Sequence, residues 1–239
     1  MKTVTTVLCL LLLNVGFAQQ VVDVSKQDVR VGQNLFFVSG GEPFVLAKFV
    51  NLVEGTPYFK DEWLKGIIVS ENDREYKNID LKIDLLDNKI HYLDANGKEF
   101  IATTSVKEVV LSADSVTNYR FVHSSTFSQS VNTMKDSWYL WLLTGTASLY
   151  KIFEKNLSEQ KPYGSATFEQ HIKTLEKYLI LYNNAFLEVK KLKEVPSVLS
   201  NKKAELEAFL KTKDDPKASM DDRFIKLIEY YNSLIKEKK

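Results

Sequence analysis

Short runs of alternating apolar and polar residues follow one another through the first half of the chain, and they constrain the fold more than any other feature. The clearest run lies at 76–85, where one set of positions is apolar and the other polar: Ile79, Leu81, Ile83 and Leu85 against Asp80, Lys82 and Asp84. Successive side chains of a β-strand point to opposite faces of the sheet, so a period of two is typical of a half-buried strand.

More strands are predicted on both sides of this run, at 63–69, 90–93, 100–104, 106–111 and 119–122. Polar turns separate them, and the turn at 94–97 ends in the Asn-Gly pair that is typical of a hairpin. Strands joined by tight turns pair in an antiparallel manner. The sequence thus predicts an antiparallel meander. A strand candidate at 35–38 and an apolar segment at 44–53, ambiguous between helix and strand, precede it.

Two later segments are also apolar. Residues 137–143 are apolar on both faces, which favours a strand covered on both sides, and 149–153 resumes the pattern. Further on, heptad spacing favours a helix through Phe168, Ile172, Leu175, Leu179, Tyr182, Phe186 and Val189. Against it, Asn183-Asn184 could close a two-residue hairpin, because asparagine tolerates the left-handed backbone conformation. Periodicity alone favours the helix.

The end of the chain carries helix signals. Ser200 can cap a helix that runs through Lys211, and Ser219 with Asp222 forms a capping box for a second helix. The second helix carries an apolar stripe that consists of Phe224, Leu227, Ile228, Tyr231 and Ile235. Such a stripe does not face water along its length, so it is expected to dock on the chain's own sheet or on the preceding helix.

The N-terminus is predicted to be a cleavable secretory signal peptide, residues 1–18. Lys2 supplies a positive start, 7–13 is a short apolar run, and Gly16 and Ala18 are the small residues of a cleavage site before Gln19. The run is too short for a membrane-spanning helix, and no later segment is long and apolar enough for one. The protein is therefore expected outside the cytoplasm, either periplasmic or extracellular.

Composition excludes several chemistries from the mature chain. The only cysteine, Cys9, lies inside the predicted signal peptide, so disulfides, thiolate nucleophiles and cysteine-ligated zinc are not expected. The full chain has 32 Lys+Arg and 31 Asp+Glu, and removal of residues 1–18 takes away one lysine and no acidic residue. A neutral chain lacks the basic surface that nucleic-acid binding requires.

Several strings in the sequence resemble one family. They are GGEPFVLAKFVNLVEGTPYF at 40–59, DEWLKG at 61–66, IHYLDANGKEFIATTSVKEVVL at 90–111, YRFVHSS at 119–125, ASLYK at 147–151, KPYGSAT at 161–167 and IEYYNSL at 228–234. Together they resemble an uncharacterised family of exported, β-rich envelope proteins of the Bacteroidota. The resemblance implies no activity or site residue. It implies further strands over 137–192, and it favours a hairpin at 177–189 over the helix.

These observations predict a mainly β protein of the α+β class, with an antiparallel sheet that is strongly curved or folded into two layers. The predicted organisation is a signal peptide at 1–18, a β domain at 19–199 and a helical pair at 200–239 that packs on the same domain.

No catalytic, metal or cofactor motif is found. The histidines lack zincin spacing, His91 is expected on a strand surface, and His123 beside Ser124-Ser125 does not by itself make a triad. Asp80, Asp84 and Asp87 are expected on a solvated strand face rather than in a glycosidase pair.

Aromatic residues are the remaining candidates for binding: Tyr58, Trp63 and Tyr163. Tyr58 and Tyr163 lie in predicted loops and are the ones expected to be exposed. The leading hypothesis is a non-enzymatic envelope module that binds an envelope protein, a glycan or a lipid. The alternatives are a hydrolase with dispersed catalytic residues and a lipid or glycan carrier with an apolar cavity. A cleft that gathers His123, a serine and a carboxylate would favour the hydrolase.

Overall fold

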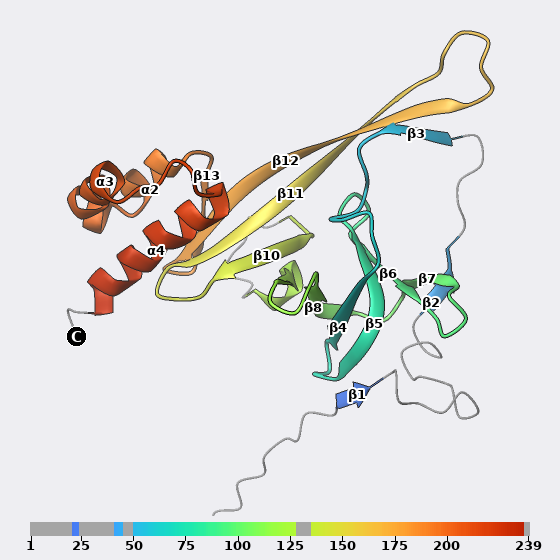
Figure 1. Ribbon diagram of the computed structural model, residues 1–239, viewed down its shortest axis with the longest axis horizontal. Helices are drawn as coiled ribbons and strands as arrows, with labels where there is room; N and C mark the ends of the chain where they lie inside the picture. The colour runs from blue at the N-terminus through green and yellow to red at the C-terminus, as the bar shows by residue number, and fades with distance from the viewer. Residues whose placement is uncertain (1–20, 24–40, 45–49, 128–134, 237–239) are drawn as a thin grey trace, which may run out of the picture.

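The computed structural model describes residues 21–23, 41–44, 50–127 and 135–236 of the chain. The predicted signal peptide, the strand candidate at 35–38 and residues 45–49 of the ambiguous segment lie outside these ranges. Within them the chain is mainly β, with α-helices confined to its C-terminal part (Figure 1). The α+β class that the sequence predicts is confirmed.

The described strands form one thirteen-stranded sheet that does not close on itself. They are β1 (Val21–Asp23), β2 (Gly41–Pro43), β3 (Val50–Glu54), β4 (Leu64–Ser70), β5 (Glu75–Asp84), β6 (Lys89–Leu93), β7 (Glu99–Ala102), β8 (Val106–Ser112), β9 (Asn118–His123), β10 (Trp138–Leu143), β11 (Ser148–Gln160), β12 (Phe168–Tyr182) and β13 (Ala185–Val189). Their order is β13-β12-β11-β10-β9-β8-β4-β5-β6-β7-β2, with β1 beside β5 and β3 beside β12. These last two pairings are parallel, whereas the neighbours along the main order are antiparallel.

The sheet curves strongly around its first core. Phe59 is tied to β5 because its backbone N–H donates to the carbonyl of Ile83 at 2.9 Å. In a flat sheet β5 and β11 would lie roughly 24 Å apart, five strand spacings of about 4.8 Å. Yet the ring centroids of Phe59 and Phe153, on β11, are 5.3 Å apart. The sheet therefore bends until strands that are distant in its order share one apolar interior.

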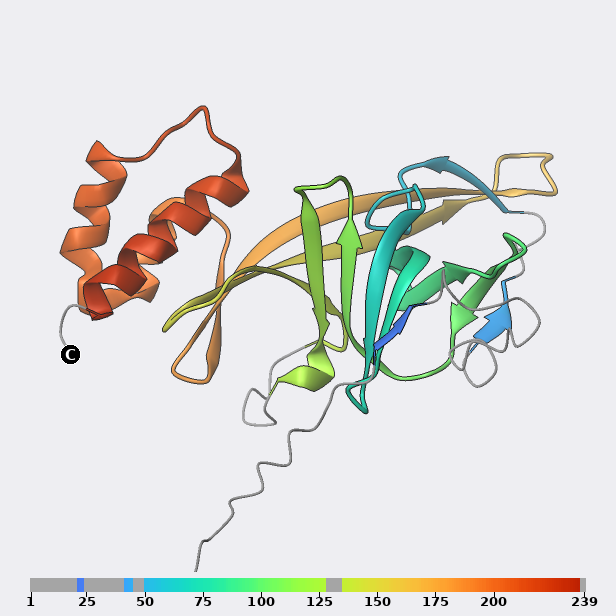
Figure 2. The ribbon, with the colours of Figure 1, turned by 60° about the horizontal axis from the view of Figure 1, so that its bottom comes forward.

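A second core lies between the far end of the sheet and the C-terminal helices. The helices are α2 (Val195–Val198), α3 (Lys203–Thr212) and α4 (Met220–Lys236), with the 3-10 turns η3 (Leu192–Glu194) and η4 (Ser200–Lys202) before and after α2. The sequence predicted two helices, and the third, α2, is a single turn that has Pro196 at its start. Figure 2 shows these helices gathered at one end of the long β11–β12 hairpin.

The apolar stripe of α4 docks inside the molecule, as predicted. Four of its members are fully buried: Phe224, Leu227, Ile228 and Tyr231. They share a core with residues of β10–β13 and of the other helices, and the ring of Phe224 stacks on Tyr178 of β12 at 4.0 Å. Both the sheet and the preceding helix α3 contact α4.

The turn between β10 and β11 is fastened to α4 by one side chain. Asn232 accepts a hydrogen bond from the backbone N–H of Ala147 at 2.8 Å and donates one to its carbonyl at 2.9 Å. A Cβ atom on Gly145 would lie 2.3 Å from the amide nitrogen of Asn232. A side chain at 145 would therefore displace the Asn232 amide from its two hydrogen bonds with Ala147.

The segment 177–189 is a hairpin, which confirms the prediction made against the heptad count. Tyr182 pairs with Ala185, and the turn residues Asn183 and Asn184 have φ angles of 51° and 59°. On β12, Tyr178 and Ile180 face the helices, whereas Leu179 and Leu181 contact an aromatic cluster on the other face. Because β12 is apolar on both faces here, its residues fit a helical spacing as well.

Candidate functional site

The end of β9 places His123 beside a cavity of about 300 Å³. His123 precedes the 3-10 turn η2 (Ser124–Thr126), and its Nδ1 accepts the backbone N–H of Ser125 at 3.3 Å. Because Nδ1 accepts, the neutral ring carries its hydrogen on Nε2, which lies 3.2 Å from Oδ1 of Asp136. The ring also makes an edge contact with Trp138, at 5.0 Å between centroids.

Two serines and a second carboxylate complete this cluster, which we call the His123 cluster. The hydroxyl of Ser124 donates to Asp136 at 2.8 Å, and that of Ser125 donates to Glu71 at 2.9 Å. Ser125 Oγ also lies 3.1 Å from Nδ1 of His123. The structure thus gathers a histidine, serines and carboxylates from the turn between β4 and β5, the end of β9 and the segment before β10.

The sequence did not indicate that Asp136 and Glu71 would meet His123. Asn88 holds the segment of Asp136 in place, because its side chain donates to the Asp136 carbonyl at 3.1 Å and accepts from the hydroxyl of Ser137 at 3.1 Å. Asn88 itself takes a left-handed φ of 57° in the turn between β5 and β6. The Asp-Asn turn was visible in the sequence, but its bonds to a segment far along the chain were not.

The hydrogen bonds of the His123 cluster differ from those of a serine hydrolase. There the serine hydroxyl donates to the histidine, and free N–H groups await the oxyanion. Here the hydroxyl of Ser125 is directed to Glu71, while the N–H groups of Ser124 and Ser125 already donate to Ser137 and His123. The cluster therefore has the residue types of a catalytic triad, but its hydrogen bonds are those of a capped turn.

A second histidine, His91, lies in the interior, so the predicted surface position is wrong. Only 1% of its side chain is exposed, and its Nδ1 lies 2.7 Å from Oε1 of Glu99 on β7. Its Nε2 lies 3.8 Å from Oδ2 of Asp84, without a hydrogen-bond partner among the described residues. The rings of Phe44 and Tyr58 meet it edge-on, at 4.9 and 5.3 Å.

Asp84 is also buried, which corrects the predicted solvated strand face. The segment 57–59 runs beside the end of β5 and covers it, through bonds from Phe59 N–H to Ile83 and from Leu85 N–H to Pro57. Burial raises the pKa of Asp84, although the N–H groups of Leu86 and Asp87 donate to its Oδ1. Alternation along the strand could not reveal this cover, because it comes from another part of the chain.

The structure brings together two of the three aromatic residues predicted to bind a ligand. The ammonium of Lys82 lies 4.7 Å from the ring centroid of Tyr58 and 5.0 Å from that of Trp63, and it also pairs with Asp61 at 2.8 Å. Tyr58 is half-buried rather than exposed, and burial raises the pKa of its hydroxyl. Tyr163 is fully exposed on a different element, the loop between β11 and β12.

The distal half of the β11–β12 hairpin and the neighbouring strand β3 together carry six of the eight large exposed apolar side chains among the described residues. We call residues 155–175 the arm, and β3 lies beside it, with Val50 opposite Phe168. The large exposed apolar residues of the arm and of β3 are Leu52, Val53, Leu157, Tyr163, Phe168 and Leu175. Outside this region the described residues contain two more, Val116 and Met220. Leu157 and Phe168 lie on one face of the hairpin and Leu175 lies on the other.

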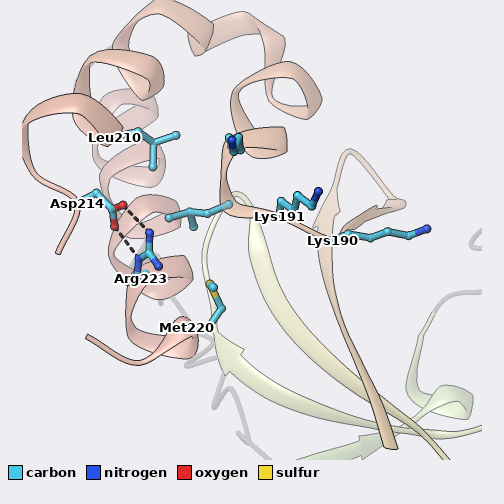
Figure 3. A pocket seen from close by; sticks show the side chains of 8 residues that line it. Lys190, Lys191, Leu210, Asp214, Met220 and Arg223 are labelled. Atoms are coloured by element: carbon cyan, nitrogen blue, oxygen red, sulfur yellow. Dashed lines mark hydrogen bonds and ion pairs between the residues drawn. The ribbon is translucent and has the colours of Figure 1, made fainter. Parts of the chain in front are cut away.

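A cavity of about 330 Å³ lies between the end of β13 and the helices (Figure 3). Arg223 on its wall donates two hydrogen bonds to Asp214, at 2.8 and 2.6 Å. Figure 3 shows the side chains of Lys190 and Lys191 directed away from this ion pair. Their ammonium groups therefore do not converge on an anion inside the cavity, and the Arg223 charge is already paired.

Among the described residues, no group of three or more His, Cys, Asp or Glu is arranged to hold a metal ion. No helix in the same ranges has both the length and the apolar character that a membrane crossing requires. No family profile, curated protein sequence or solved structure matches the chain.

Proposed function

We propose that this chain is an exported, non-enzymatic envelope protein that binds a partner through the arm and β3. The observation that carries the proposal is the concentration of exposed apolar side chains on the projecting hairpin and on β3 beside it (Figure 1). Elsewhere in the described chain, large apolar side chains are mostly in one of three cores. Export is tested by a separate measurement, the N-terminal sequence of the recovered protein. The product found outside the cytoplasm should begin at or near Gln19.

The arm is held in one orientation by the body of the protein. Pairing between β11 and β12 is continuous from Ser148 opposite Leu181 to Gln160 opposite Glu169. The proximal part of the hairpin is anchored to the helices because Lys151 of β11 pairs with Asp221 of α4 at 2.9 Å. A surface that is ordered before binding loses less conformational entropy when a partner docks. The ordered arm is therefore suited to binding a protein partner.

Two features support a protein partner rather than a glycan. Sugar binding by aromatic residues needs free ring faces, and the ammonium of Lys82 lies over both Tyr58 and Trp63. The exposed side chains of the arm are aliphatic as often as aromatic: Leu157 and Leu175 against Tyr163 and Phe168. Such a mixture suits contact with apolar side chains of another protein.

Site-specific photo-crosslinking in the native envelope tests the proposal. A photo-reactive residue is placed at Leu157, Tyr163 or Leu175 on the arm, with Val116 as the matched control. Val116 is 85% exposed and lies outside the arm, in the turn between β8 and β9. We expect a discrete crosslinked product from the arm positions and none from Val116. Equal or absent crosslinking at all positions would refute the arm as the binding surface.

A second candidate function, ester or amide hydrolysis, rests on the His123 cluster. A cleft that gathers His123, a serine and a carboxylate would favour a hydrolase, and the structure meets this condition in part. His123, Ser125 and Asp136 lie within hydrogen-bond reach beside a cavity. Activity would require the Ser125 hydroxyl to turn from Glu71 to His123. The test is labelling by a fluorophosphonate probe, with Ser125→Ala as the variant and Ser124→Ala as the control. Absence of labelling in the wild type would eliminate this candidate.

A further inference from the structure

The outer edge of the arm has no neighbouring strand in the described part of the chain. β10 pairs with β11 from Leu143 opposite Leu149 to Leu140 opposite Lys151, and no pairing extends further along β11. On the other side of the hairpin, β3 pairs with β12 at 168–171. Residues 156–160 of β11 are exposed. The distal half of β11 is therefore an edge strand whose outward N–H and C=O groups can pair with another strand.

This edge lacks two of the usual protections against strand addition, a proline and a bulge, and carries charged side chains. Natural edge strands are blocked by proline, bulges, short length or charged side chains. Between Glu154 and Gln160 there is no proline, and the register with β12 runs without a shift. Two charges lie on the same strand face, Lys155 and Glu159, with Leu157 between them. They are opposite in sign and symmetric about the leucine.

We propose that the partner of the arm is a second copy of this chain, paired antiparallel along β11 about a two-fold axis at Leu157. The inference rests on the proposed function, because it identifies the partner that the arm binds. In this register Leu157 lies opposite itself, and Lys155 of each copy lies opposite Glu159 of the other. Two-fold dimers place the same surface patch on both sides of the interface, as this arrangement does.

Charge selects this register among the alternatives. A two-fold axis normal to the sheet keeps paired residues on one face, so the partner of each residue can shift only in steps of two. One step in one direction places Lys155 opposite Lys161, and one step in the other places it opposite Leu157. Neither alternative sets Lys155 against Glu159. Cross-strand pairs of opposite charge stabilise a sheet and like charges oppose pairing, so the register at Leu157 is favoured.

Lys155 and Glu159 are both placed so that they can form the cross-strand ion pairs of this register. In the single chain, Lys155 donates to the hydroxyl of Thr174 at 3.0 Å, and Glu159 accepts from Gln170 at 2.5 Å. Both of those partners are neutral, and the carboxylates that act on the Lys155 charge from further away are Asp84 and Glu176. In the paired state each charge would meet an opposite charge at the cross-strand distance, about 5 Å between Cβ atoms.

Cysteine crosslinking tests the geometry directly. In a Cys9→Ser background, Leu157→Cys would place two cysteines about 5 Å apart between Cα atoms, within the range of a disulfide. Leu175→Cys is the matched control, because Leu175 is exposed on the same arm but lies on β12, opposite Glu154. Across the paired arms its two copies would be about 25 Å apart, from three strand spacings of about 4.8 Å across the sheet and six residues of about 3.4 Å along it. We expect rapid disulfide dimers from Leu157→Cys alone. Equal rates for the two variants would overturn the proposal.

A charge swap tests the register. Sedimentation measures the dimer dissociation constant of the wild type, Lys155→Glu, Glu159→Lys and the double variant, and thermal unfolding confirms that each is folded. Each single reversal sets like charges opposite each other twice, and should raise the dissociation constant about tenfold. The double variant restores both pairs and should return within about twofold of the wild type.

The two proposals can fail separately. A wild type that stays monomeric at roughly 100 μM, or a double variant as weak as the singles, would overturn self-pairing. If the photo-crosslinked product at Leu157 then has a mass that is not twice that of the chain, the arm still binds a partner. Absence of any arm crosslink would remove the binding surface itself.

Discussion

The substitution Leu227→Ala tests how firmly the helices belong to the body of the protein. Leu227 is fully buried in the core between α4 and the sheet, with Phe224 and Tyr231 on the same helix face. Replacing a buried leucine by alanine costs about 2–5 kcal/mol, and the cost is larger where the surroundings cannot collapse into the cavity. Here α4 is fixed near both ends, by Asp221 to Lys151 and by Asn232 to Ala147.

Because both anchors hold the helix in place, we expect the upper part of that range, about 3–5 kcal/mol. The free energy of unfolding is measured by urea denaturation, with Lys226→Ala as the control. Lys226 neighbours Leu227 on α4 but is exposed, so its loss should cost less than about 0.5 kcal/mol. For a chain of this size, the leucine variant should melt about 10 °C lower. If the two variants unfold at the same urea concentration, the docking argument is wrong.

Three further predictions concern single polar residues. Asn183→Ala should destabilise the protein by roughly 1–2 kcal/mol, because alanine resists the left-handed φ of 51°, whereas Asn183→Gly should be close to neutral in urea denaturation. The hydrogen bonds from Arg223 lower the pKa of Asp214, so this pair stabilises the fold above the unfolded pKa of about 3.9 and the gain is lost as the pH falls through the lowered value. Asp214→Asn should therefore lose about 1 kcal/mol at pH 7 and progressively less as the pH falls through the lowered pKa, and an equal loss at every pH would contradict the pairing. Burial raises the pKa of Asp84, so stability should be full below about pH 3.9 and fall as the pH rises through the raised value; Asp84→Asn should remove this dependence in unfolding curves recorded at several pH values.

The meander could be predicted because its strands carry their own signal. Alternation along 76–85 and the Asn-Gly turn at 96–97 reflect burial of one face and a tight reversal, and both are local properties. The hairpin at 177–189 could be predicted only in part, since Asn183-Asn184 marks the turn while the flanking residues fit two periods. The end of β11 could not be predicted as a strand, because its residues 156–160 are exposed and show no apolar alternation.

The candidate sites depend on contacts that are distant in sequence, and this is why they could not be predicted. His123 meets Asp136 because Asn88, in another turn, bonds to the Asp136 carbonyl. His91 and Asp84 are in the interior because 57–59 covers the strand end. In each case the residue types were visible in the sequence, but the segment that buries or orients them comes from elsewhere in the chain.

The pairing of β3 with β12 has a consequence for the order in which the protein can form. Val50 and Phe168 are partners, yet more than 100 residues separate them along the chain. A ribosome adds roughly 5–20 residues per second, so β3 waits several seconds for the strand that shelters it. Contacts between such distant segments also slow the search for the native arrangement. Throughout that interval the backbone N–H and C=O groups of β3 lack the strand they pair with, which makes the nascent polypeptide a natural substrate for holdase chaperones until β12 has been made.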